Sequence, residues 1–242
     1  MTQRVLIALE TAAQPGGAAL IGDDGRVLAE EIQDAASRHG RGLFPAVTAC
    51  LERAGRGMDD VAGVIVDAGP GSYTGLRVGV MSAKALAFGR GVPVVAVASL
   101  DAIAWGARAT GGTLAVCMDA RQDEVYFAVY ALSADGAVRH GAIRAISPDE
   151  AIAALHALPE GARCVGSGCV RIGLERLRAE CPGRMVDETA TPAPAAVAEL
   201  GWRAWRENPA GVDVLALQPS YPRREGVEMQ VLGEGYQAPA GR

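Results

Sequence analysis

The segment 68–89 is the stretch of this sequence whose residue types come nearest to a known chemical motif. It reads AGPGSYTGLRVGVMSAKALAFG and follows a run of apolar residues that predicts a buried strand. A glycine-rich turn between a strand and a helix exposes backbone N–H groups that can hold an anion. A P-loop needs Gly-Lys-Ser or Gly-Lys-Thr, but Gly75 is followed by Leu-Arg. A dinucleotide-binding turn needs G-x-G-x-x-G, but Gly69, Gly71 and Gly75 are spaced one residue too widely. An anion-binding turn and a plain turn capped by Ser72 or Thr74 therefore remain as alternatives.

The helix predicted after this turn carries a stripe of small residues. Gly75, Gly79, Ala83 and Ala87 recur every four residues, so they share one face of the helix. Glycine inside a helix costs about 1 kcal/mol relative to alanine, so two glycines here indicate that another backbone must approach closely. That neighbour is either a helix of the same chain, such as 43–54, or a helix of another subunit.

Acidic residues at the ends of two predicted strands are the next candidates. Glu10 and Asp119 end the first strand of each half, where an actin-like or sugar-kinase-like nucleotide site carries an acid. Thr11 follows Glu10, but Ala-Ala comes next, and no second glycine-rich phosphate loop follows Asp119. The charges of residues 119–124 are typical of a solvated turn.

Metal and nucleophile motifs are weak in this sequence. The five cysteines form no C-x-x-C pair, and the three histidines do not lie near them at ligand spacing, so no zinc site is expected. The nucleophile motif G-x-S-x-G of the α/β-hydrolases is missing as well.

Periodicity indicates the elements that must position these residues. Apolar and alternating runs predict strands at 5–9, 18–21, 27–32, 61–66, 92–97, 114–118, 124–132, 137–146 and 163–166. The runs 61–66 and 92–97 are apolar throughout, which predicts central strands covered on both faces. Helical spacing and capping residues predict helices at 43–54, after the glycine turn to about 89, from Ser99 or Asp101, at 147–158, at about 170–179 and from about 191 to 206.

The two halves of the chain repeat the same order of elements. Each begins with a strand, an acid, a strand, an Asp-Gly turn and a third strand, and each continues with helices and further strands. We interpret this order as a duplicated βββαβα unit, with chance similarity of two strand meanders as the alternative. The expected domains are 1–110 and 111–224, followed by a flexible tail at 225–242.

Composition narrows the class of protein. The chain has 242 residues, of which 50% are hydrophobic, so it can bury a core and is not disordered as a whole. Its net charge of −5 argues against a dedicated nucleic-acid binder, which needs a basic surface to neutralise phosphates. No apolar run approaches the ~18 residues of a membrane helix. An odd number of cysteines without a framework suits a reducing cytoplasm.

Several segments together resemble the bacterial TsaB (YeaZ) family, and the order and spacing of these segments along the chain match over about residues 4–224. They are LIALETA, RHGRGLFPAV, DARQDEVYFAVY, PSYPRR and the long central segment DAGPGSYTGLRVGVMSAKALAFGRGVPVVAVASLDAIA. The resemblance implies an α/β fold of the ASKHA (actin-like ATPase, RNase H-like) class with two lobes. It also implies a subunit that supports TsaD in forming N6-threonylcarbamoyladenosine (t6A37) on tRNA.

The same resemblance implies a role without catalysis. The metal motif of TsaD is H-x-E-x-H, and the matching stretch Arg38–Gly42 keeps one histidine, His39, and no acid. Glu10-Thr11-Ala12 replaces the commoner Asp-Thr-Ser or Asp-Thr-Ala, which makes nucleotide binding by this chain less expected. No catalytic residue, metal or cofactor is expected. The partners expected are TsaD and the ATPase TsaE, with tRNA reached only through the complex, and the chain can also pair with a second copy.

The resemblance places the contact with TsaD on two helices of the first lobe, and so favours another subunit as the neighbour of the small-residue stripe. The residues expected there are Leu43, Phe44, Val47, Leu51, Gly71, Ser72, Tyr73, Thr74, Gly75, Leu76, Gly79, Val80 and Ala83. Two alternatives remain. One is an ATP-dependent small-molecule kinase of the ASKHA superfamily. The other, less favoured, is an M22-type metallopeptidase, for which no nucleophile or zinc ligand set is present.

Overall fold

The computed structural model describes residues 4–33, 42–121 and 123–222. It divides the chain into two compact units. The first unit contains the described residues up to Ala102 together with Pro192–Ser220, and the second contains Ile103–Thr191 with Tyr221 and Pro222. The expected tail 225–242 and the stretch around His39 lie outside the described residues.

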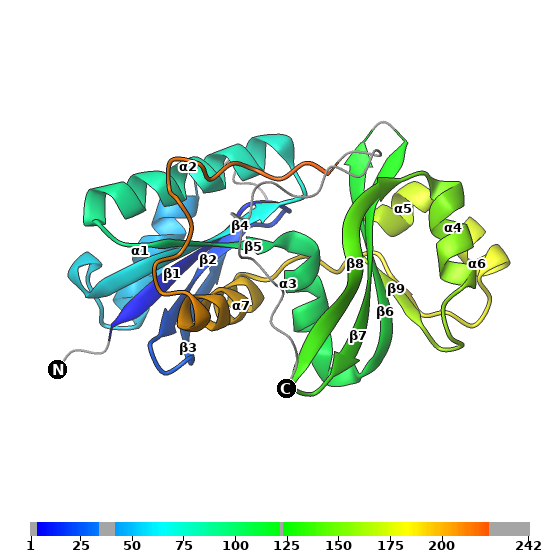
Figure 1. Ribbon diagram of the computed structural model, residues 1–242, viewed down its shortest axis with the longest axis horizontal. Helices are drawn as coiled ribbons and strands as arrows, with labels where there is room; N and C mark the ends of the chain where they lie inside the picture. The colour runs from blue at the N-terminus through cyan, green and yellow to red at the C-terminus, as the bar shows by residue number, and fades with distance from the viewer. Residues whose placement is uncertain (1–3, 34–41, 122, 223–242) are drawn as a thin grey trace. The chain divides into compact units, whose positions relative to one another are not determined.

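The first unit is built on a five-stranded mixed sheet (Figure 1). Its strand order is β3-β2-β1-β4-β5, in which β1–β2 and β2–β3 are antiparallel while β1–β4 and β4–β5 are parallel. All side chains of β1, β2 and β4 are buried, which agrees with their continuous apolar runs. The strands are β1 (Val5–Glu10), β2 (Gly17–Gly22), β3 (Val27–Ile32), β4 (Val61–Gly69) and β5 (Val94–Ala98).

Helices cover both faces of this sheet. Figure 1 shows α2 (Tyr73–Arg90) and α7 (Pro194–Glu207) on opposite faces. The helix α1 (Leu43–Arg53) packs on β2 and β3, and α2 packs mainly on β4. The short helix η1 (Met58–Asp60) precedes β4, and α3 (Ser99–Gly106) follows β5 directly.

The second unit repeats the arrangement of the first. Its sheet has the order β10-β9-β6-β7-β8, so in both units the first strand lies between the second and the fourth. In each unit the first and fourth strands are parallel. The duplication predicted from the sequence is therefore confirmed at the level of topology. The elements are η2 (Arg108–Thr110), β6 (Gly112–Arg121), β7 (Glu124–Ser133), β8 (Gly136–Ile146), α4 (Pro148–His156), β9 (Arg163–Val165), α5 (Gly168–Ile172), α6 (Leu174–Glu180) and β10 (Val186–Asp187).

Four expectations about the elements differ from the structure. β5 is an edge strand, buried because α7 packs on it and Val212 bridges to Val94. The helix expected at 170–179 is two helices, because Gly173 adopts φ +102 between them. The strand β10 has only two residues and was not predicted. The helix α7 packs on the sheet of the first unit, whereas the domain expected at 111–224 would have placed it in the second.

The core of the second unit contains four cysteines. Cys117, Cys164, Cys169 and Cys181 are all buried, among apolar residues such as Phe127. Sγ of Cys164 lies 3.5 Å from the sulfurs of both Cys117 and Cys169, and all four thiols are free. These residues act as small core residues in a chain that has few aromatics.

Candidate partner-binding site

The turn before α2 is closed by its own unit. Ser72 is the helix cap, and its Oγ accepts a hydrogen bond of 3.3 Å from the Gly75 N–H. The Ser72 N–H donates to the Ala12 carbonyl at 2.8 Å. Thr11 Oγ1 donates to the Gly75 carbonyl at 2.8 Å. The loop after β1 therefore lies directly against the start of α2, which favours a plain capped turn over an anion site.

The small-residue stripe faces the interior of the first unit. Gly79, Ala83 and Ala87 are buried, and Gly75 is half-buried. A Cβ atom at Gly75 would overlap the carbonyl oxygen of Thr11, and one at Gly79 would overlap Thr11 Oγ1. The close neighbour of these glycines is thus the loop after β1 in the same unit. The expectation of a helix from another subunit against this stripe is therefore wrong.

The other residues expected in the contact divide between the core and the surface. The apolar side chains of Leu43, Val47, Leu51, Leu76 and Val80 are buried within the unit. Gly71 and Ser72 are half-buried in the turn.

Phe44, Tyr73 and Thr74 are the exposed members of the expected set, with 49% of Phe44 and 48% of Tyr73 accessible. A partner can thus touch these three without unfolding the unit.

The outward side of α2 carries further apolar residues that sequence reasoning missed. Met81 is 62% exposed and Phe88 is 83% exposed. Together with Tyr73 they follow helical spacing along one side of the helix, and we name these three residues the α2 outer face. The sequence contained a signal for this face, because these large apolar residues fall at helical positions outside the small-residue stripe. Large exposed apolar patches are typical of interaction sites.

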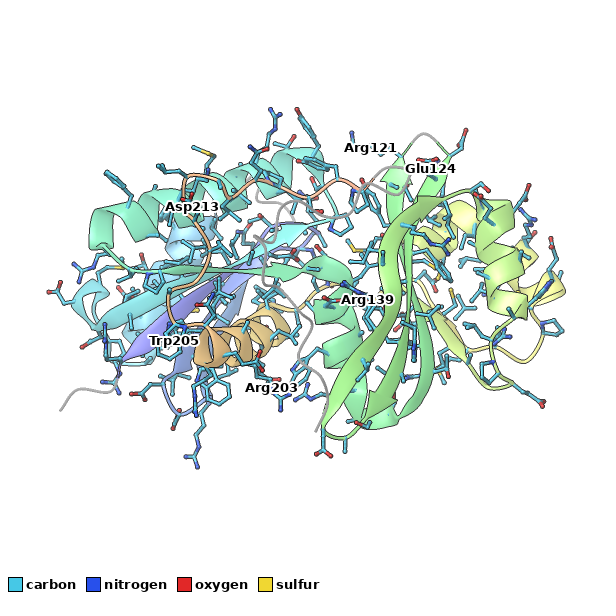
Figure 2. The ribbon with its side chains drawn as sticks, viewed as in Figure 1. Arg121, Glu124, Arg139, Arg203, Trp205 and Asp213 are labelled. Atoms are coloured by element: carbon cyan, nitrogen blue, oxygen red, sulfur yellow. The ribbon has the colours of Figure 1, made fainter. Side chains whose placement is uncertain are left out.

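Polar contacts flank the α2 outer face. The guanidinium of Arg77 lies 4.2 Å from the ring centroid of Tyr73. Lys84 Nζ donates to the Leu215 carbonyl at 3.0 Å and so ties the segment after α7 to the helix. Figure 2 shows Asp213 on this segment, where its carboxylate accepts the Leu215 N–H at 2.8 Å. Leu215, whose carbonyl accepts the hydrogen bond from Lys84, is itself 82% exposed.

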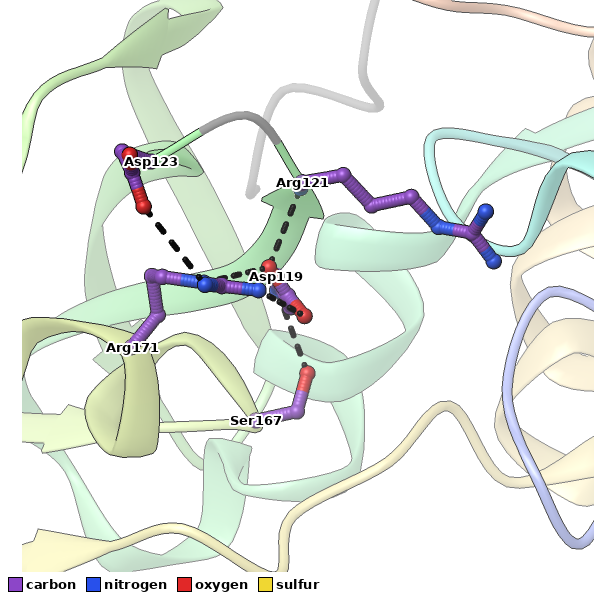
Figure 3. A network of polar contacts seen from close by, with 5 residues as sticks. All are labelled: Asp119, Arg121, Asp123, Ser167 and Arg171. Atoms are coloured by element: carbon purple, nitrogen blue, oxygen red, sulfur yellow. Dashed lines mark hydrogen bonds and ion pairs between the residues drawn. The ribbon is translucent and has the colours of Figure 1, made fainter.

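The acid at the end of the first strand of the second unit is engaged by an arginine (Figure 3). Arg171 donates to both oxygens of Asp119, at 3.0 and 3.1 Å. The N–H of Arg121 donates to the same carboxylate at 3.0 Å, and the N–H of Asp119 donates to Ser167 Oγ at 3.2 Å. Arg171 also pairs with Asp123 at 3.7 Å. This geometry supports the interpretation of residues 119–124 as a charged turn.

Replacing Arg171 by methionine is expected to lower the urea midpoint slightly at pH 7 and by less near pH 3. Partial burial alone would raise the pKa of Asp119, but the hydrogen bond from Arg171 and its charge lower the pKa below the usual value. A lowered pKa stabilises the fold above the unfolded value of about 3.9 and loses that effect as the pH falls. The effect is small because both side chains are more than one third exposed. An equal loss at both pH values would contradict this account.

The matching acid of the first unit, Glu10, is fully buried. Its Oε1 accepts the Ala13 N–H at 3.0 Å. Within the ranges 4–33, 42–121 and 123–222, no three His, Cys, Asp or Glu side chains are grouped so that they could hold a metal ion. None of the helices in those ranges is long and apolar enough to cross a membrane.

Comparisons with known proteins place this fold and these residues in a family. Residues 29–157, more than half of the chain, match the family described as TsaD, tRNA N6-adenosine threonylcarbamoyltransferase. The chain is 33% identical over 145 residues to the tRNA threonylcarbamoyladenosine biosynthesis protein TsaB of Bacillus subtilis, covering 60% of each chain. It is 42% identical over 129 residues to an uncharacterized protein of Mycobacterium leprae, covering 52% of this chain and 35% of that protein. The chain thus spans less than two thirds of the length of either relative.

A solved structure agrees with the fold throughout. A Pseudomonas aeruginosa protein, described as similar to the peptidase YeaZ, superposes with a TM-score of 0.77 at 26% identity. The match covers 91% of this chain and 100% of that protein. The α/β fold of the ASKHA class expected from the sequence is therefore confirmed.

Proposed function

Because the chain belongs to the TsaD-type family and, within it, to the TsaB (YeaZ) branch, we propose that it is the accessory subunit of t6A37 formation. In this role it binds and stabilises the catalytic subunit TsaD, acts together with the ATPase TsaE, and transfers no group itself. The tRNA is reached only through the complex, in keeping with the net charge of −5. The compartment proposed is the cytoplasm.

The α2 outer face is the observation that carries the proposed contact with TsaD. Its three large apolar side chains stand exposed along one helix, from Tyr73 to Phe88. At 1.5 Å per residue they span about 22 Å, a length that a helix of a partner can cover. Phe44 and Thr74 belong to the proposed contact as well, because both are exposed. The buried members of the expected set contribute by holding α1 and α2 in place. A second copy of the chain would compete for the same face.

The state of the two strand-end acids supports a subunit without catalysis. Glu10 is fully buried and faces its own loop, and Asp119 is neutralised by Arg171. The glycine turn that could have held a phosphate packs against Thr11 and Ala12. No observation in the structure favours a kinase or a peptidase over the accessory subunit.

Calorimetric titration of the purified chain into TsaD tests the proposal. Saturable binding is expected with TsaD, whereas titration with magnesium and ATP should give no heat of binding. Magnesium–ATP binding by the isolated chain, together with no binding of TsaD, would instead support the kinase.

A further inference from the structure

Two buried carboxylates lie side by side at the carboxyl ends of neighbouring strands in the first unit. Leu9 of β1 is paired with Val66 of the parallel strand β4, so the next residues, Glu10 and Asp67, are also neighbours. Parallel strands lie about 4.8 Å apart, and residues in register point to the same face of the sheet. Both side chains have no accessible surface.

Each carboxylate has one oxygen that is hydrogen-bonded and one that is not. Glu10 Oε1 accepts the Ala13 N–H, while Asp67 Oδ1 accepts from Ser99 Oγ at 2.6 Å and from the Gly69 N–H at 2.8 Å. Glu10 Oε2 and Asp67 Oδ2 are buried without a hydrogen-bond partner. Two adjacent negative charges in this position would each lack solvation and would repel one another.

We propose that Glu10 and Asp67 hold one proton between them at neutral pH, and that this proton keeps the N-terminal end of α2 in place. The proton removes one of the two charges and supplies a donor for an oxygen that otherwise has none. This assignment concerns the chain alone and needs no partner.

The surroundings of the pair favour the bound proton. Asp101 of α3 adds a third negative charge near Asp67, whereas the loop after β1 and the start of α2 face the pair with the neutral residues Thr11 and Gly75. Burial, and then the charge of Asp67, raise the pKa of Glu10 well above its usual value. Burial also raises the pKa of Asp67 to about 7, although the hydrogen bonds from Ser99 and Gly69 oppose this.

A short chain of contacts connects the pair to α2. Glu10 accepts a hydrogen bond from the Ala13 N–H. The two residues before Ala13 in the same loop form hydrogen bonds with the start of α2. The Ala12 carbonyl accepts the Ser72 N–H, and Thr11 donates to the Gly75 carbonyl. Loss of the proton would place two charges beneath this loop, so we expect the first turn of α2 to loosen. Since α2 also carries the outer face, docking of TsaD would weaken at high pH, a consequence that rests on the proposed function.

The sign of the pH dependence follows from the raised pKa values. The folded chain keeps a proton that the unfolded chain releases above about pH 4, so stability falls as the pH rises. For Asp67, whose pKa is about 7, the fall is complete somewhat above that pH. One retained proton changes the unfolding equilibrium constant by about tenfold between pH 6 and pH 8.

Carboxyl ¹³C NMR of the full chain tests the proton directly. With Glu10→Gln and Asp67→Asn used to assign the two signals, one macroscopic step of the pair should have its midpoint above pH 6. Both carboxylates titrating below pH 5 would overturn the proposal. If Asp67→Asn fails to fold, the loss of the high step in Glu10→Gln serves for assignment. A failure of TsaD binding would leave this result unaffected.

Urea unfolding and hydrogen exchange test the link to α2. The unfolding equilibrium constant of wild type should increase about tenfold between pH 6 and pH 8. In Glu10→Gln it should change less than about twofold, because the side-chain amide supplies Asp67 with a donor in place of the proton. Asp119→Asn alters the equivalent acid of the second unit and should keep the wild-type dependence. Hydrogen exchange of the backbone amides of residues 72–75, corrected for the pH dependence of the intrinsic exchange rate, should speed up at pH 8 in wild type only. An equal dependence in wild type and Glu10→Gln would overturn the link.

Discussion

Replacing Met81 and Phe88 together by aspartate is expected to weaken binding of TsaD by at least about 100-fold while the chain stays folded. Both side chains are mostly exposed, so the substitutions should change the free energy of unfolding of the isolated chain only slightly. In the complex each apolar side chain would contribute about 1.5–3 kcal/mol by burial, and 1.4 kcal/mol corresponds to a factor of ten. A buried carboxylate adds a desolvation penalty. Calorimetry with purified TsaD measures the effect.

Met185→Asp is the matched control for Met81→Asp. Both methionines are 62% exposed, but Met185 precedes β10 in the second unit. We expect Met185→Asp to bind TsaD with unchanged affinity and Met81→Asp alone to lose about tenfold. Equal losses in both variants would indicate a general effect of charge. Unchanged binding by the double variant would remove the α2 outer face from the interface.

Gly79→Leu is expected to prevent folding of the first unit, and Gly79→Ala to destabilise it by about 1–3 kcal/mol, as other overpacked cores are. The added Cβ would overlap Thr11 Oγ1, and the backbone of α2 cannot withdraw because Leu76 and Val80 are buried on either side. Urea unfolding followed by tryptophan fluorescence measures the change. Trp202 and Trp205 report on the first unit, in which Figure 2 marks Trp205 on α7.

Two further variants separate the overlap from the effect of alanine itself. Adding Thr11→Ala to Gly79→Ala removes the overlapping oxygen, so the double variant should be more stable than Gly79→Ala alone. Gly89→Ala lies in the same helix with open space around its Cβ and should gain up to about 1 kcal/mol of helix propensity. Additive effects of the two substitutions at Thr11 and Gly79 would contradict the proposed overlap.

The order of elements could be predicted from the sequence because local chemistry determines it. The Asp-Gly turns and alternating strands of the two meanders each signal a hairpin, and Ser147 with Pro148 signals the start of α4. These signals recur in the same order in both halves, so the duplication follows from them without any long-range information.

The direction in which α2 faces could not be predicted from its residues. Small residues permit close approach of a helix, a strand or a loop alike, and here the loop after β1 occupies the space. The same applies to β5, whose apolar run is typical of a central strand although it lies at the edge. Its cover comes from α7, about 100 residues further along the chain.

Contacts between residues far apart in the sequence could not be predicted either. Glu10 and Asp67 become neighbours only through the register of β1 and β4, and Arg171 reaches Asp119 only because α5 packs on β6. Neither pair leaves a spacing signal in the sequence. The exposed Met81 and Phe88, by contrast, were readable from helical spacing once the inner face of α2 was known.

The content of t6A in digested total tRNA, measured by mass spectrometry after depletion of the chain, tests the central claim most directly. The proposed function predicts that t6A falls on depletion and is restored by wild type and by Met185→Asp. The double variant with aspartate at Met81 and Phe88 should restore little, although it accumulates to the same level. Unchanged t6A after depletion, or full restoration by that double variant, would contradict the account.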